Sequence, residues 1–293
     1  MTIKKKRVTK SLAHGRPPTL QKPKSISRQA TKALINAHHV LEKRKAQAVS
    51  KGDTVQQIAI DKEIAALGGI EKYQQASLQG QRNDRGGDSS RVLMEWLKPV
   101  HPALKEASQG AGRPLRMLEV GALSTTNECS KSRFFSMQRI DLNSQGEGIM
   151  QQDFMERPLP KDDSERFDII SLSLVLNFVP DARVRGDMLL RTLEFLVQPG
   201  NVDTELQKFF PSLFLVLPAP CVTNSRYMDE SRLEAIMTSI GYIKTEYKLT
   251  QKLVYYLWTR TNKPASRTKF AKTQVRTGGS RNNFAILLNG SSG

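Results

Sequence analysis

Several features that would assign the chain to a common class are missing from its 293 residues. No run of about 18 apolar residues occurs, so we expect no membrane span. The basic amino-terminal end is not followed by an apolar segment, which argues against a secretory signal peptide. Only two cysteines are present, Cys129 and Cys221, and they provide neither a disulfide framework nor a zinc-ligand spacing. We therefore expect a protein of a reducing compartment that holds no metal.

Motifs of three common enzyme classes are also missing. The four histidines all precede the first predicted strand, which argues against a histidine-based hydrolase. No Gly-x-x-x-x-Gly-Lys-Ser/Thr loop is present to cradle a phosphate. Residues 121–126, which follow the first predicted strand, lack the Gly-x-Gly-x-x-Gly pattern of a nicotinamide enzyme.

Acidic residues are nearly absent from two segments of a strongly basic chain. The net charge of +17 favours a polyanionic partner. Residues 1–50 carry 13 Lys/Arg against one acid, and residues 260–281 carry seven against none, whereas residues 111–200 hold 11 basic and 13 acidic residues. The positive charge therefore lies on two arms and not on the central part. Solvated, disordered tails are the alternative interpretation of each arm.

Composition divides the chain into three parts. Residues 1–28 are rich in Lys, Arg, Ser and Pro, and we expect a disordered tail whose Lys4–Arg7 cluster resembles a nuclear localisation signal. Residues 29–112 predict a helical segment. Its helices are expected over 29–50, from Thr54 in a capping box with Gln57 to residue 67, over 70–78 and around 90–98.

The third part, residues 113–289, predicts a doubly wound α/β domain because short apolar runs alternate with helical patterns. Strands are expected over 115–120, 134–140, 149–152, 167–176, 213–217 and 242–249, and helices over 181–197 and 230–240. The last strand is either 253–258 or 284–288. We prefer 284–288, with the basic residues 260–281 as a loop before it.

Two of these strands end on residues suited to an adenosine cofactor, since ligands of open α/β sheets bind at the carboxyl ends of strands. Gly121 lets the backbone approach a ligand closely. Only Glu119 and Gly121 fit the acid-x-Gly-x-Gly-x-Gly pattern of methyltransferases, because Leu123 and Thr125 stand where further glycines would be. Asp141 can accept hydrogen bonds from both ribose hydroxyls. A plain strand-to-helix turn and a capping aspartate are the alternatives.

The next two strand ends offer groups for bases. Asp153 can bind an adenine amine and Phe154 can stack on the ring, or both can be ordinary turn residues. Asn177 can hold the edge of a target base and Phe178 can pack against its face. The alternative for this pair is a strand-end turn and a core aromatic residue.

Five segments of the chain resemble the fungal 25S ribosomal RNA adenine-N1 methyltransferase family. They are residues 68–77, 85–90, 118–121, 140–143 and 173–180. The resemblance implies a Rossmann-like class I sheet that uses S-adenosylmethionine, with Gly121 and Asp141 as cofactor residues. It also implies large-subunit ribosomal RNA as the substrate, pre-ribosomal particles as partners, and a place in the nucleus and nucleolus.

Adenine N1 attacks with an in-plane lone pair, so the chemistry needs positioning and no general base. The target base must be unpaired or flipped, because N1 lies on its Watson–Crick edge. Asn177 would then orient the exocyclic amine while Phe178 stacks. A non-catalytic S-adenosylmethionine sensor or scaffold and a protein methyltransferase are the alternatives. The helical residues 54–98 either cap the cofactor side of the sheet or simply extend the fold.

Overall fold

The computed structural model describes residues 28–69, 88–109, 114–144, 146–200, 205–263 and 268–290. The basic tail before Arg28, the helix expected over 70–78 and residues 85–87 of the segment 85–90 lie outside these ranges. In the described part of the chain, no helix has the length and apolar character that crossing a membrane requires.

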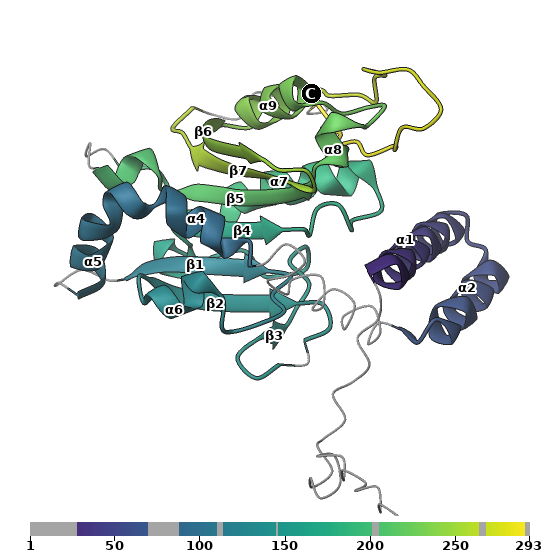
Figure 1. Cartoon of the computed structure of the whole chain (residues 1–293), viewed down its shortest axis with the longest axis horizontal. Helices are drawn as coiled ribbons and strands as arrows, with labels where there is room; N and C mark the ends of the chain where they lie inside the picture. The colour runs from purple at the N-terminus through teal and green to yellow at the C-terminus, as the bar shows by residue number, and fades with distance from the viewer. Residues whose placement is uncertain are drawn as a thin grey trace, which may run out of the picture.

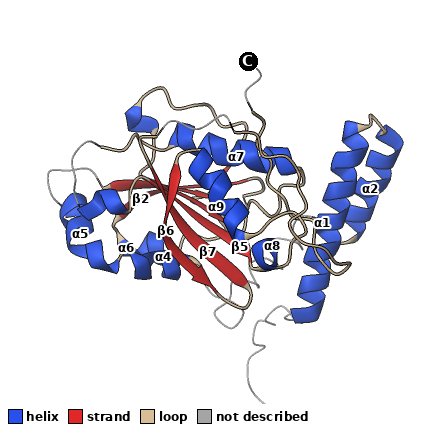
Figure 2. Ribbon diagram, turned by 90° about the horizontal axis from the view of Figure 1, so that it is seen from above, coloured by secondary structure: helices blue, strands red, loops and turns tan. Residues whose placement is uncertain are grey.

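A seven-stranded sheet with the order β3-β2-β1-β4-β5-β7-β6 (Figure 1) forms the centre of the protein, between helices (Figure 2). The strands are β1 Leu115–Val120, β2 Phe135–Asp141, β3 Met150–Gln151, β4 Ile169–Ser173, β5 Ser212–Pro218, β6 Tyr242–Leu249 and β7 Leu253–Arg260. β7 is antiparallel to both of its neighbours, and the other pairs are parallel. This is the Rossmann-like class I sheet that the sequence predicted. The strand order reverses between β1 and β4, where such sheets bind ligands.

Helices cover both faces of the sheet, which explains the uninterrupted apolar strands. One face is packed by α4 Ser90–Trp96, α5 His101–Gln109 and α6 Glu128–Ser132, through buried residues such as Leu93 and Leu104. The other face is packed by α7 Ala182–Phe195, α8 Pro220–Thr223 and α9 Glu230–Ser239, through residues such as Leu189 and Ile236. Short 3-10 turns lie at Lys98–Val100, Asp163–Glu165 and Glu205–Lys208.

The helices α1 Arg28–Ser50 and α2 Thr54–Ala66 form a hairpin with a small core of its own, built around Leu41 and Ile60. Figure 1 shows this hairpin beside the body of the protein. The capping box predicted at Thr54 is wrong by one residue. The Asp53 carboxylate accepts a hydrogen bond from Gln56 N at 2.9 Å and caps α2, because a carboxylate one residue earlier reaches the exposed amides.

The preferred last strand was also wrong. β7 is formed by Leu253–Arg260, and the apolar residues 284–288 make only an isolated bridge between Leu288 and Phe270. A short connection lets β7 fold back on β6 as a hairpin, so it takes the place beside β5. Phe284, Ile286 and Leu288 are instead buried in the same hydrophobic cluster as Leu189 of α7 and Ile236 of α9. Arg260 therefore ends a strand, and the basic loop begins after it.

Candidate active site

The carboxyl ends of β1, β2, β3 and β4 lie side by side at one edge of the sheet. Val120 pairs with Ile140 of β2 and with Leu172 of β4, and Asp141 pairs with Gln151 of β3. The parallel register therefore brings the predicted residues after these four strands to a common edge, as the sequence analysis expected.

Gly121 allows the loops after β1 and β4 to touch. Its φ of +73° is a left-handed conformation that favours glycine. A Cβ atom at this position would lie 2.6 Å from Cγ2 of Val175, which is too close for any real contact. The Gly121 amide donates to the Ile140 carbonyl at 2.8 Å, which holds the turn against β2. Only glycine at position 121 therefore lets the backbone of this turn lie so close to Val175 at the switch point.

Glu119, near the end of β1, stabilises the turn through hydrogen bonds to Asn127. Its carboxylate accepts hydrogen bonds from Nδ2 of Asn127 at 2.9 Å to each oxygen, and Nε of Arg139 lies 4.0 Å away. Burial raises the pKa of Glu119 to about 7, although Asn127 and Arg139 both favour the ionised form. Asn127 also caps α6 by accepting from Ser130 N at 2.9 Å. Glu119 therefore ties β1 to the start of α6, a link through Asn127 that the sequence analysis missed.

Asp88 is a second missed residue of the site. It forms a clamp with Ser90: Asp88 Oδ1 accepts from the amide and the hydroxyl of Ser90 at 2.9 and 2.7 Å, and Oδ2 accepts from Glu128 N at 2.7 Å. Next to it, the hydroxyls of Ser89 and Ser173 share a hydrogen bond of 2.8 Å. The clamp thus joins α4 to α6, and Ser89 joins it to the end of β4. The Asp-Ser-Ser pattern signals a helix cap, but sequence could not show that it reaches two other segments.

Asp141 and Asp153 each occupy a strand-end turn and are half-buried. Asp141 Oδ1 accepts from Asn143 N at 2.8 Å, and Asp153 Oδ1 accepts from Met155 N at 2.7 Å. These are the turn bonds that the sequence analysis gave as the alternative. They also fix both carboxylates at the strand-end edge of the sheet.

Phe154 lies in the hydrophobic core and not at the strand-end edge. Its side chain is 2% exposed, and its ring centre is 5.3 Å from that of Phe195 in α7. The Arg191 guanidinium lies 6.0 Å from the ring and donates to the Phe154 carbonyl at 2.8 Å. No face of the ring is open to stack on an adenine in this position.

The target loop, residues 174–180 after β4, carries Asn177 and Phe178. The loop begins at Leu174, whose φ of +59° is unusual for a residue with a side chain. This turn ends β4 at Ser173, earlier than the predicted strand 167–176. The Asn177 amide oxygen is buried and has no hydrogen-bond partner among the described residues. Such an acceptor costs about 1–3 kcal/mol unless a ligand supplies a donor.

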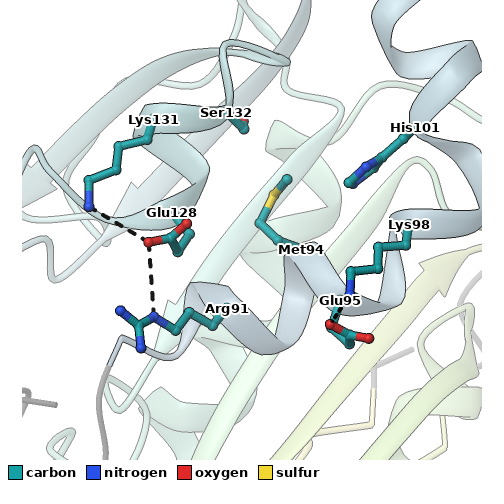
Figure 3. A pocket seen from close by; sticks show the side chains of 8 residues that line it. All are labelled: Arg91, Met94, Glu95, Lys98, His101, Glu128, Lys131 and Ser132. Carbon is teal, nitrogen blue, oxygen red and sulfur yellow. Dashed lines mark ion pairs between the residues drawn. The ribbon is translucent and has the colours of Figure 1, made fainter.

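An open surface cleft of about 510 Å³ lies between α4 and α6 (Figure 3). It is lined by Arg91, Met94, Glu95, Lys98, His101, Glu128, Lys131 and Ser132. Its charges largely pair with one another: Glu128 lies 3.9 Å from Arg91 and 3.6 Å from Lys131. None of the predicted site residues lines it. Elsewhere in the described residues, no cluster of three or more His, Cys, Asp or Glu is arranged to hold a metal ion.

Comparison with known proteins identifies the family of the chain. Residues 58–286 match the family described as 25S rRNA (adenine(2142)-N(1))-methyltransferase, Bmt2. A 25S rRNA adenine-N(1) methyltransferase of Schizosaccharomyces pombe is 38% identical over 254 residues, which cover 86% of this chain and 89% of the relative. The Saccharomyces cerevisiae 25S rRNA (adenine(2142)-N(1))-methyltransferase is 41% identical over 228 residues, which cover 77% of this chain and 62% of the relative.

Two solved structures show only distant similarity. The N-methyltransferase NodS of Bradyrhizobium japonicum, in complex with S-adenosyl-L-homocysteine, is 14% identical with a TM-score of 0.36, over 57% of this chain and 87% of that one. The 16S rRNA methylase RmtB is 12% identical with a TM-score of 0.33, over 80% and 76% of the two chains. The family match and the Schizosaccharomyces pombe relative cover most of the chain, so this protein belongs to the Bmt2 family of 25S rRNA adenine-N1 methyltransferases.

Proposed function

We propose that the chain transfers the methyl group of S-adenosylmethionine to N1 of an adenine in 25S ribosomal RNA. The family match over residues 58–286 carries this proposal, because it spans the sheet and every strand-end residue of the site. The geometry supports the same reaction, since it brings a cofactor edge at β1 to β3 next to the target loop after β4.

The strand-end edge fits S-adenosylmethionine. In this proposal the left-handed turn at Gly121 would let the backbone approach the methionine part, Asp141 would accept from the ribose hydroxyls, and Asp153 would accept from the adenine amine. When bound, the cofactor supplies a methyl group that its sulfonium has already activated. Glu119 and the Asp88 clamp hold the turn around it, and Phe154 contributes packing only.

The target base needs orientation more than acid–base help, because adenine N1 attacks through a lone pair and loses no proton. The buried Asn177 oxygen has no donor among the described residues, and the exocyclic amine of a flipped adenine would provide one. Phe178 follows directly and is half-buried, so its ring can pack against the base. The loop would thereby place N1 in line with the methyl group and keep water out.

We also propose that the protein acts in the nucleus and nucleolus on pre-ribosomal particles. Its support is the basic Lys4–Arg7 cluster and the nature of the substrate, since ribosomal RNA is assembled there. A non-catalytic S-adenosylmethionine sensor would use Gly121 and Asp141 in the same way. It would have no use for the unsatisfied acceptor of Asn177 or for the basic arms.

Deletion of the gene tests the reaction. We expect mass mapping of large-subunit RNA from the deletion strain to show the loss of one N1-methyladenosine. Wild-type protein should restore the modification and Gly121→Arg should not. Unchanged N1-methyladenosine after deletion would refute the proposed activity and favour the sensor.

Asn177→Ala tests the target loop. We expect kcat on 25S RNA to fall by about 10- to 100-fold with unchanged cofactor affinity, because the lost contact is with the base. Asn262→Ala, an exposed asparagine beyond β7, is the matched control and should keep the wild-type rate. Wild-type kcat in Asn177→Ala would show that the amide does not orient the base.

A further inference from the structure

Residues 282–288, which we call the C-terminal brace, lie beside α7 and the loop after α8, outside the sheet. Figure 1 shows this end of the chain near α8. Phe284, Ala285, Ile286 and Leu288 are buried. The brace is bonded to α7 by Leu287 N, which donates to Ala182 O at 2.9 Å. It is bonded to the loop after α8 by the hydroxyl of Ser225, which donates to Phe284 O at 2.6 Å.

Gly186 explains how closely the brace lies on α7. A Cβ atom here would be 1.9 Å from the Leu287 carbonyl oxygen and 3.0 Å from its carbon. Glycine inside a helix costs about 1 kcal/mol relative to alanine. Glycine is nevertheless required at position 186, because any side chain there would collide with the main chain of the brace.

Arg185, the residue before Gly186, connects the brace to the target loop. Its Nε donates to Val179 O at 2.8 Å, and its two terminal nitrogens donate to Ala285 O at 2.7 Å and to Pro180 O at 3.4 Å. The guanidinium carbon lies 4.6 Å from the centre of the Phe284 ring. Arg185 is 8% exposed, and burial lowers its pKa to about 10. The buried guanidinium of Arg185 therefore bonds the target loop and the C-terminal brace at the same time.

The two loop carbonyls held by Arg185 directly follow Asn177 and Phe178. The entry of the loop is held by Leu174 N, which donates to Val216 O of β5, and a turn inside the loop is closed by Phe178 N, which donates to Val175 O, each at 2.9 Å. Arg185 thus holds the last two residues of the target loop in place, while the first residue of the loop is held by its bond to β5.

We propose that Arg185, held by the C-terminal brace, is a positioning residue that sets the location of Asn177 and Phe178 for methyl transfer. The inference rests on the proposed reaction of the target loop. Its physical basis is that a flexible exit would let the Asn177 oxygen move relative to the methyl donor. A misplacement of about 1 Å can lower a rate by about 100-fold.

Arg185→Lys is the test, because an ammonium keeps the charge but cannot span Val179 O and Ala285 O as a planar fork does. Arg260→Lys is the matched control. Arg260 is also partly buried and donates to three carbonyls, those of Leu193, Leu196 and Val197, but at the opposite edge of the sheet. We expect Arg185→Lys to lower kcat by about 10- to 100-fold at saturating RNA and cofactor, with cofactor Kd unchanged. Arg260→Lys should lower Tm while kcat of the folded protein stays within about twofold of wild type.

Hydrogen exchange of the Phe178 amide gives a second readout that needs no RNA. We expect faster exchange in Arg185→Lys and wild-type exchange in Arg260→Lys, because only the first releases the loop. If Arg185→Lys does not fold, Phe284→Leu removes the ring beside the guanidinium and should show the same changes to a smaller degree.

Equal kcat and equal Phe178 exchange in the two lysine variants would overturn the proposal. Failure of the reaction itself is distinguishable, because wild-type protein would then leave 25S RNA unmethylated. The exchange comparison would still decide whether Arg185 holds the loop.

Discussion

Gly121 lies in a turn that lacks the other glycines of the methyltransferase pattern. Leu123 and Thr125 occupy those positions, so the backbone of the turn has less freedom of its own. Side chains from outside shape it instead: Asn127 bonds Glu119, and Asp88 bonds the amide that begins α6. These contacts hold the shape of the turn although its glycine motif is degenerate.

Gly121→Ala should weaken cofactor binding and destabilise the protein by about 1–3 kcal/mol, because alanine pays for the left-handed φ and for a clash with Val175. Gly52→Ala is the control, since Gly52 has a φ of +69° and nothing within 4 Å of its Cβ position. Chemical denaturation and calorimetric titration with cofactor measure the two effects. Identical losses in both variants would show that contact with Val175 is unimportant.

Glu119 makes stability depend on pH. Its pKa of about 7 in the folded protein lies above the ordinary value of 4.5, so between these values the folded state holds a proton that the unfolded state has lost. The free energy of unfolding should therefore fall as pH rises from 4.5 to 7, by on the order of 3 kcal/mol from this group, and become level above 7.

Glu119→Gln should remove this contribution while keeping an acceptor for Asn127. Urea denaturation from pH 4.5 to pH 8 would show the variant gaining stability over wild type as pH rises. A constant difference between the two proteins across that range would show that Glu119 titrates normally.

At the scale of elements, the Asp88 clamp couples two short helices that would be weak alone. Asp88→Ala leaves the amides of Ser90 and Glu128 without their carboxylate, so we expect a loss of about 1–3 kcal/mol and weaker cofactor binding. Asp162→Ala is matched to it, because Asp162 makes the same two bonds to Ser164 without bridging to a second helix. Asp162→Ala should lower the free energy of unfolding by less than Asp88→Ala and leave the cofactor Kd unchanged. Equal effects of the two substitutions would show that Asp88 acts only as a local helix cap.

The basic segment after β7 contains an arginine that bonds to main-chain carbonyls and lysines that are exposed to solvent. The Arg276 guanidinium donates to Ser225 O at 3.2 Å and Met228 O at 2.7 Å, and Arg226 donates to Gly278 O at 3.0 Å. These arginines hold the segment over the loop after α8. Lys269 and Lys272 are exposed, and Lys272 Nζ lies 4.4 Å from the Tyr227 ring centre. The sequence count for residues 260–281 placed Arg276, Lys269 and Lys272 together in one basic arm.

At the scale of the molecule, the net charge of +17 suits a polyanionic substrate. Replacing Lys269 and Lys272 by alanine should weaken RNA binding and flatten its dependence on log salt by roughly 1.5, since each phosphate contact on single-stranded RNA contributes about 0.7. Lys105 and Lys208, exposed near the amino ends of the strands, are the control pair, and Lys208 also lies over an aromatic ring. Equal slopes for the two double variants would show that only net charge matters.

The sheet was largely predictable because buried parallel strands are runs of apolar residues, and the match at β1 and β6 extends to the residue. The strand-end positions of Gly121 and Asp141 followed from the same runs, whereas Asn177 lies in the loop after β4, which ends earlier than predicted. Phe154 did not follow, because an aromatic residue after a strand can turn toward a ligand or toward a helix, and packing against Phe195 decided it.

Sequence by itself thus determined the class of sheet, the order of its strand ends and the resemblance to a methyltransferase family, because these depend on local apolar patterns and on motifs. Only the tertiary structure decided which of two similar apolar runs became β7, since that choice depends on pairing with β5 and β6. It alone showed that Asp88 reaches α6 and that Arg185 reaches Ala285, 100 residues away in the chain. Hydrogen bonds over such separations leave no periodic signal in a single sequence, so their partners appear only when the chain is folded.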